Sequence, residues 1–105
     1  MISVIFTESG SALTGFHISG HSGYADEGSD IVCAAVSSAS LMAANTVTEI
    51  QKLSADITVN DGFLNLDLSP KDAEEASVTL EGLRLHLTAL SQEYPQFIKV
   101  TISEV

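Results

Sequence analysis

His21 and Cys33 are the residues of this chain whose types and spacing favour joint chemistry. Cys33, the only cysteine, follows His21 by twelve positions and lies near the start of a segment with helical periodicity. Near a helix N-terminus, unpaired N–H groups and the positive end of the dipole stabilise a thiolate over a thiol. A histidine held close can form a thiolate–imidazolium pair, which is what a cysteine nucleophile requires, and the same N–H groups can stabilise an oxyanion.

Residue types alone leave other interpretations open. A lone cysteine in an alanine-rich helix is usually a small buried hydrophobe. A metal site built from His17, His21 and Cys33 is disfavoured, because the two histidines would lie about 13 Å apart on one extended strand at ~3.3 Å per residue. A thiol redox protein is disfavoured because no second cysteine is present as a resolving thiol.

A hairpin must position the histidine. Residues 2–7 and 12–19 are rich in β-formers and are joined by turn residues, so they predict two paired strands. Alternation along the second strand puts His17 and His21 on the same face. The glycine-rich stretch from Gly20 to Ser29 predicts a mobile loop, with Gly20 as a hinge that brings His21 to Cys33. On that interpretation, Gly20→Ala slows catalysis and leaves the melting temperature nearly unchanged.

A helix must position the cysteine. Ser29 or Asp30 is expected to cap it. The segment is apolar nearly all round, so we expect it to pack on two sides, against its own sheet and a second subunit. Although the stretch between Asp30 and Glu49 has no charge, polar residues interrupt it and acidic residues flank it, which favours a buried helix over a membrane span. Its apolar and small positions recur at helical spacing at Val32, Val36, Ala39, Ala43, Val47 and Ile50.

The second half repeats the pattern of hairpin and helix. Residues 56–68 predict a hairpin whose turn, Asp61-Gly62, is a pair favoured where both residues take positive φ. That turn places Val59 opposite Leu64 and Ile57 opposite Leu66. A helix capped by Ser69 follows, in which Gly82 is expected to mark a close helix contact. Its apolar stripe consists of Ala76, Leu80, Leu83, Leu87 and Leu90. Residues 97–105 predict a last strand on whose inner face Ile98, Val100 and Ile102 lie. The order ββαββαβ favours a two-layer α+β or α/β fold: one domain over residues 1–105, with a mixed five-stranded sheet and two helices on one face.

Charge and composition limit the function classes. The net charge of -10 disfavours direct nucleic-acid binding and is compatible with a basic partner. A single cysteine forms no disulfide within the chain, and the N-terminal stretch lacks the basic region of a signal peptide, so we expect a cytoplasmic protein.

The whole string around the two candidate residues is more specific than the pair. It closely resembles the signature of the bacterial ribosomal-processing cysteine proteases, the Prp family, and the likeness extends over the full length. Two departures stand out: Ser22 occupies a position where alanine is common, and Asp26-Glu27 is more acidic than expected. The residues that carry the resemblance are Gly15-Phe16, Gly20-His21-Ser22, Gly28, and Asp30 to Ser37.

The resemblance implies that Cys33 is the nucleophile and His21 the general base. Asp30 then caps the helix alone or also orients the loop or His21, and Ser37, one turn after Cys33, either hydrogen-bonds near the thiol or allows close helix packing. It also implies a homodimer without a cofactor. The expected substrate is the N-terminal extension of a basic bacterial large-subunit ribosomal protein, cut after an aromatic residue and before a small one.

The alternative is a non-catalytic dimeric binding module or chaperone for that ribosomal protein. Retention of both His21 and Cys33 in their motif context favours the enzyme, because a binding module needs neither.

Overall fold

The computed structural model describes residues 1–26 and 30–105, so the motif positions Glu27, Gly28 and Ser29 lie outside the described residues. The predicted order ββαββαβ is confirmed, with the second helix divided into α2 and α3 at Ala76. The elements are β1 (Ile2–Ser9), β2 (Ala12–Ser19), α1 (Ile31–Asn45) with its continuation η1 (Thr46–Ile50), β3 (Ala55–Asn60), β4 (Phe63–Leu68), α2 (Pro70–Glu75), α3 (Ser77–Glu93) and β5 (Ile98–Glu104).

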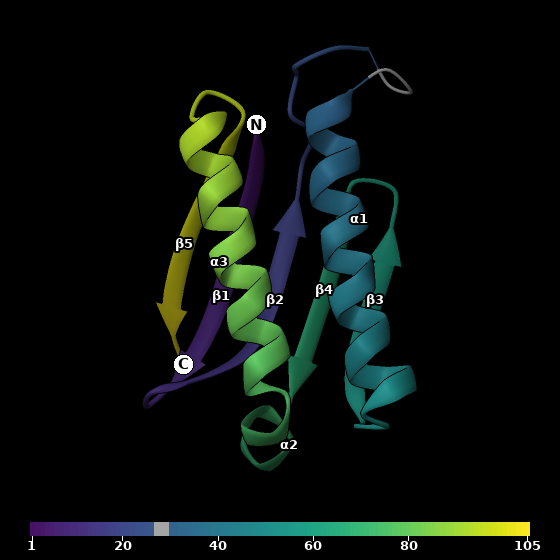
Figure 1. Ribbon diagram of the computed structural model, residues 1–105, viewed down its shortest axis with the longest axis vertical. Helices are drawn as coiled ribbons and strands as arrows, with labels where there is room; N and C mark the ends of the chain where they lie inside the picture. Colours follow the sequence, from purple (N-terminus) through teal and green to yellow (C-terminus); the bar gives the residue numbers. More distant parts are fainter. Residues whose placement is uncertain (27–29) are drawn as a thin grey trace.

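The five strands form one mixed sheet in the order β3-β4-β2-β1-β5. β1 pairs with β5 in parallel, whereas the pairs β1–β2, β2–β4 and β3–β4 are antiparallel. Figure 1 shows α1 and α3 side by side on the same face of this sheet, with α1 over β3 and β4 and α3 over β1 and β2. The predicted two-layer architecture is therefore confirmed.

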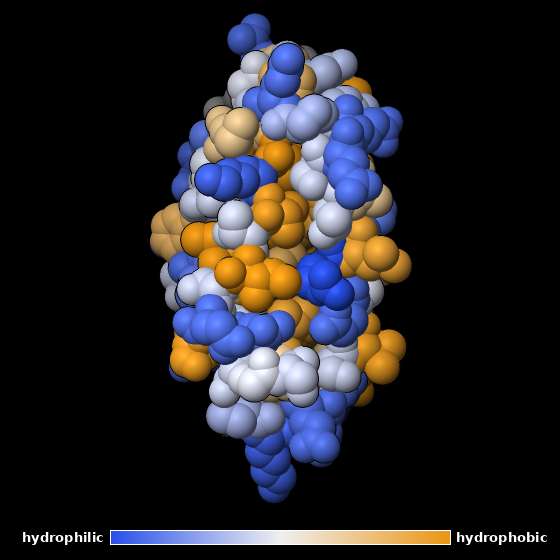
Figure 2. All heavy atoms as spheres, turned by 90° about the vertical axis from the view of Figure 1, so that its left-hand side faces the viewer, coloured by the Kyte–Doolittle hydropathy of each residue, from blue (hydrophilic) through white to orange (hydrophobic). Residues whose placement is uncertain are grey.

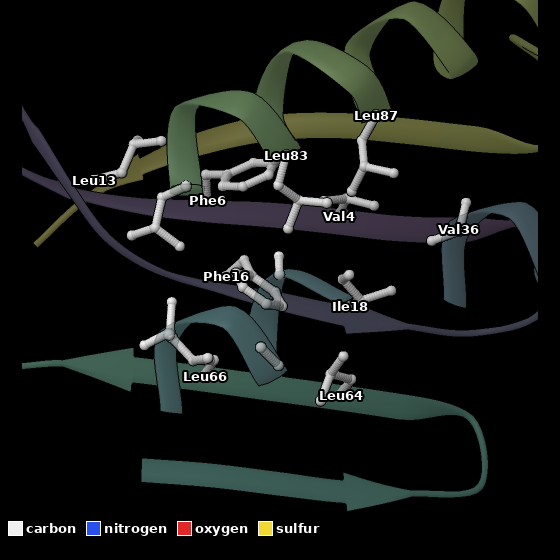
Figure 3. Close-up of a cluster of buried hydrophobic side chains, with 14 of the residues drawn as sticks. Val4, Phe6, Leu13, Phe16, Ile18, Val36, Leu64, Leu66, Leu83 and Leu87 are labelled. Atoms are coloured by element: carbon white, nitrogen blue, oxygen red, sulfur yellow. The ribbon is translucent and has the colours of Figure 1, made fainter. Parts of the chain in front are cut away.

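The core lies between the sheet and the two helices. Alternate residues of the strands point toward the helices, as the two-residue period of a half-covered sheet requires. On the opposite, uncovered face, His17 pairs with Asp67 at 2.9 Å, which agrees with a structural role for His17. Figure 3 shows the buried side chains that meet in this layer, which include Val4, Phe6, Phe16, Ile18, Val36, Leu64, Leu66, Leu83 and Leu87.

The second hairpin has the predicted register and the predicted two-residue turn at Asp61-Gly62, but not the predicted turn conformation. Val59 is opposite Leu64 and Ile57 is opposite Leu66. Gly62 has a φ of +88°, whereas Lys52 is the only non-glycine residue with positive φ in the described ranges. The expectation that Asp61 also takes positive φ is therefore wrong, because glycine alone supplies the left-handed conformation at this turn.

The first helix follows its predicted stripe as far as Val47. Ile50 was expected on the buried face, but its side chain is 76% exposed. The reason is the π-helical turn η1, which needs more residues per turn than an α-helix and so moves Ile50 off the stripe. By length and composition the segment Ile31–Ile50 is apolar enough to cross a membrane, but here one side of it packs on the sheet and against α3.

Two positions in the C-terminal third also differ from expectation. A Cβ at Gly82 would meet no atom within 4 Å, so Gly82 marks no close helix contact. Ile98 is buried as expected, but Ile102 is 48% exposed, because β5 forms an edge of the sheet. Figure 2 shows this side of the molecule, where apolar side chains gather in a strip between polar ones.

Two leucines of α3 provide a test of where the core lies. Leu80 is fully buried, whereas Leu85 is 72% exposed. We expect Leu80→Ala to lower the free energy of unfolding by about 2–5 kcal/mol, because it removes buried apolar area and leaves a cavity. The matched control Leu85→Ala should change it by less than about 0.5 kcal/mol. Urea unfolding followed by circular dichroism measures both, and equal effects would contradict this packing.

Candidate active site

His21 and Cys33 both line one cleft of about 530 Å³. Its walls come from α1, from the end of β2 and from the turn between β3 and β4. The predicted site residues Gly20, His21, Asp30, Cys33 and Ser37 all line it, together with Leu41, Val59, Asp61 and Gly62. The structure therefore brings together side chains from three segments that are far apart in the sequence.

Gly20 explains how His21 reaches this cleft. β2 ends at Ser19, and Gly20 has a φ of +91°. Its N–H donates to the carbonyl of Gly62 at 2.9 Å. Nε2 of His21 lies 3.5 Å from the position that a Cβ at Gly62 would occupy, so the imidazole lies beside this turn.

The expectation that His21 shares the face of His17 is wrong. His21 lines the cleft with Ile18 and Val36, on the helix-covered side, because the left-handed residue Gly20 breaks the strand alternation before His21 is reached.

Cys33 lies in the first turn of α1 and is half-buried. Its Sγ accepts a hydrogen bond from the backbone N–H of Ser22 at 3.3 Å. Its own N–H donates to Oδ1 of Asp30 at 2.9 Å, so Asp30 is the N-cap of the helix. The Cys33 N–H is therefore bonded to the helix cap and is not free to stabilise an oxyanion. The N–H that faces the sulfur comes from Ser22, in the preceding loop.

The Asp30 carboxylate is stabilised in its charged form. The hydroxyl of Ser22 donates to Oδ2 of Asp30. This bond, followed by the Cys33 N–H, holds the pKa of Asp30 below its ordinary value of 3.8. Asp30 is therefore an anion at neutral pH, and it contributes a negative charge to the cleft beside Cys33.

The described part of the predicted mobile loop is anchored. Ser22 is buried, and its hydroxyl oxygen accepts the N–H of Tyr24 at 3.0 Å. The ring of Tyr24 packs edge-on against Tyr94 and Phe97, with ring centroids 6.0 and 5.3 Å away. Residues 22–24 are therefore held both at the cleft and at the junction of α3 with β5.

Two contacts that the sequence left open are not formed among the described residues. The His21 ring and the Cys33 sulfur are not hydrogen-bonded to each other, and the exposed Ser37 hydroxyl bonds to no described residue. No group of three or more His, Cys, Asp or Glu side chains that could hold a metal ion occurs in residues 1–26 and 30–105.

Sequence reasoning missed the contribution of the Asp61-Gly62 turn to the cleft. The turn was recognised, but its position depends on the pairing of β2 with β4, which brings Phe63 opposite Ser19.

Comparison with known proteins identifies the family. The model of the family described as cysteine protease Prp matches residues 1–99. The chain belongs to the cysteine protease Prp family. The ribosomal processing cysteine protease Prp of Bacillus subtilis (strain 168) is 27% identical over 92 residues, which cover 82% of each chain. The chain is therefore a cysteine protease of this family.

Solved structures agree with the Prp fold. SMU.848 from Streptococcus mutans is 27% identical, with a TM-score of 0.86 over 100% of this chain and 96% of that one. The essential ribosomal processing protease Prp from S. aureus, in complex with a covalently linked product peptide, is 24% identical, with a TM-score of 0.90 over 98% of this chain and 100% of that one. At this level of identity, the likeness to the S. aureus protein shows a shared fold.

The backbone conformation at Gly20 predicts that Gly20→Ala destabilises the fold. A Cβ there would lie 2.5 Å from the carbonyl oxygen of Met1, at a φ of +91°. We expect Gly20→Ala to lower the free energy of unfolding by roughly 1–3 kcal/mol, and this prediction replaces that of an unchanged melting temperature. The control Gly82→Ala, in an open helical position, should raise stability by up to about 1 kcal/mol. Thermal unfolding measures both, and an unchanged midpoint for Gly20→Ala would contradict the close approach of Gly20 to the Met1 carbonyl.

Proposed function

We propose that this cysteine protease is an endopeptidase in which Cys33 is the nucleophile and His21 is the general base. The observation that carries the proposal is that the only cysteine of the chain lines the same cleft as His21. A cysteine protease needs a cysteine nucleophile, and this chain has one candidate. Gly20, Asp30 and Ser37 support the pair: Gly20 turns the backbone toward the cleft, Asp30 caps the helix, and Ser37 lines the wall.

The reaction follows from the two side chains. His21 takes the thiol proton, and Sγ of Cys33 attacks the scissile carbonyl carbon to form a tetrahedral oxyanion. As the C–N bond breaks, the imidazolium gives the proton to the leaving amine, and a thioester remains. His21 then deprotonates a water that attacks the thioester, which releases the carboxylate and restores the thiol. Catalytic hydrogen bonds often tighten only when substrate binds, so a separated pair in the free protein is compatible with this sequence.

The proposed substrate is the N-terminal extension of a basic large-subunit ribosomal protein. The B. subtilis relative is named as a ribosomal processing protease, and the S. aureus protein has been crystallised with a substrate peptide. Asp30 and Asp61 make the cleft acidic, while Leu41 and Val59 add apolar wall. With a net charge of -10, the surface attracts a cationic partner and speeds encounter. A cytoplasmic location is part of this proposal, because a ribosomal substrate is made there.

Peptide cleavage tests the assignment of the two residues. The probe is a peptide with an aromatic–small junction followed by lysines, and mass spectrometry detects the products. We expect Cys33→Ala to abolish cleavage and His21→Ala to slow it by at least about 10²-fold. His86→Ala, a control at an exposed histidine of α3, should cleave like the wild type. Cleavage by Cys33→Ala would refute the mechanism, and tight binding without cleavage by the wild type would favour the binding module.

We further propose that the enzyme is a homodimer whose subunits meet through the outer face of α1 and η1. Met42 and Ile50 are 69% and 76% exposed there, and Ile31 is also exposed. Exposed apolar side chains that gather on one surface favour a protein contact. A second copy of the chain is the proposed partner, because the resemblance of the motif to that of the Prp family implies a homodimer.

Sedimentation tests the dimer. At micromolar concentration we expect the wild type to sediment at twice the chain mass of 11.0 kDa. Met42→Glu should give monomers, because a charge at the contact would lose its hydration on association. Leu85→Glu, at an exposed leucine of α3, should remain dimeric. A monomeric wild type, or a dimer broken only by Leu85→Glu, would contradict this interface.

A further inference from the structure

We propose that Ser22 is a positioning residue: its hydroxyl bridges Asp30 and Tyr24 and thereby holds the backbone N–H of Ser22 on the Cys33 sulfur. The inference rests on the proposed function, because it treats Cys33 as the nucleophile. Ser22 lies in the loop between β2 and α1, and it is buried.

Three hydrogen bonds close a ring between the loop and the helix. The Ser22 N–H donates to Sγ of Cys33 at 3.3 Å, and the Ser22 hydroxyl donates to Oδ2 of Asp30. The other carboxylate oxygen, Oδ1, accepts the Cys33 N–H at 2.9 Å. Because one carboxylate holds both the serine side chain and the cysteine backbone, the Ser22 N–H is fixed relative to the sulfur.

The ring resolves an electrostatic conflict. The carboxylate of Asp30 places a negative charge close to Cys33, which opposes ionisation of the thiol. The Ser22 hydroxyl and the Cys33 N–H both donate to this carboxylate and offset part of its charge, while the Ser22 N–H donates to sulfur directly. A hydrogen bond to an ionised acceptor is stronger than one to a neutral acceptor, so this N–H favours the thiolate over the thiol.

Tyr24 supports the arrangement from the other side of Ser22. Its N–H bonds to the serine hydroxyl at 3.0 Å, and its ring rests on Tyr94 and Phe97. The aromatic contacts do not involve the hydroxyl. We therefore expect a variant without the hydroxyl to keep the loop near the cleft but to lose the fixed direction of the Ser22 N–H.

Asp30 provides a readout of the bond between the hydroxyl and the carboxylate. The Ser22 hydroxyl is the main cause that holds the pKa of Asp30 below 3.8, so its removal should raise that pKa. An NMR titration of the Asp30 carboxyl group follows this change independently of Cys33 reactivity. The other titratable side chains that line the described cleft are His21, Asp61 and Cys33 itself, and all are retained in the variants below.

Alkylation of Cys33 by iodoacetamide tests the inference without any peptide substrate. Rates would be measured at pH 7 for the wild type, Ser22→Ala, Ser22→Thr and the control Ser38→Ala, whose serine is exposed on α1 outside the cleft. We expect Ser22→Ala to react about 3–10-fold more slowly, which corresponds to the net effect of losing one hydrogen bond. Ser22→Thr, which keeps the hydroxyl, should restore most of the rate, and Ser38→Ala should match the wild type.

Wild-type reactivity in Ser22→Ala would overturn the proposal, as would a Ser22→Thr variant as slow as Ser22→Ala. The result is separable from the cleavage assay. Slowed alkylation in a protein that cleaves no peptide would refute the proposed function and leave the positioning role standing. Normal alkylation in a protein that does cleave would refute the positioning role alone.

Discussion

The carboxylate of Asp30 is the interaction on which both the helix and the site depend. One of its oxygens takes the Cys33 N–H that the first turn of α1 would otherwise leave unpaired. The other takes the hydroxyl of Ser22 and so ties the loop after β2 to the same point. The start of α1 is therefore fixed by a side chain that also fixes the approach of the loop. For this reason the cysteine lies in the first turn of the helix and faces the cleft.

A second constraint is that the helices cover only one face of the sheet. Both long helices lie on the same face (Figure 1), so a residue from a strand can meet α1 only on that face. Strand alternation would have carried His21 to the uncovered face, where His17 pairs with Asp67. The left-handed conformation of Gly20 and its bond to Gly62 turn the chain back toward the helices. The same glycine leaves room for the carbonyl of Met1, so the backbone here serves the fold and the site together.

The sequence predicted the parts of the fold that depend on local periodicity. The register of residues 56–68 and the buried stripe of α3 follow from periods of two and 3.6 residues, which are visible in a short window. It did not predict the reversal at Gly20, which requires contacts with Met1 and Gly62. The π-helical turn that exposes Ile50 was missed for a related reason, because the phase of a helix end is decided by its packing rather than by composition.

The candidate site shows the same division. His21, Cys33 and Asp30 could be predicted from residue types and motif spacing. Ser22 stood out only as a departure from the motif, because its three hydrogen bonds depend on how the loop folds against α1.

The acidity of the site bears on its proposed substrate. A carboxylate beside a nucleophilic cysteine opposes the thiolate, yet with Asp61 it makes the cleft attractive to a cationic peptide. Donors on both oxygens of Asp30 offset the first effect at short range, while the net charge of -10 acts on a basic partner from further away. In the proposed mechanism, the short reach of hydrogen bonds and the longer reach of charge allow one acidic chain to activate a thiol and to attract its substrate.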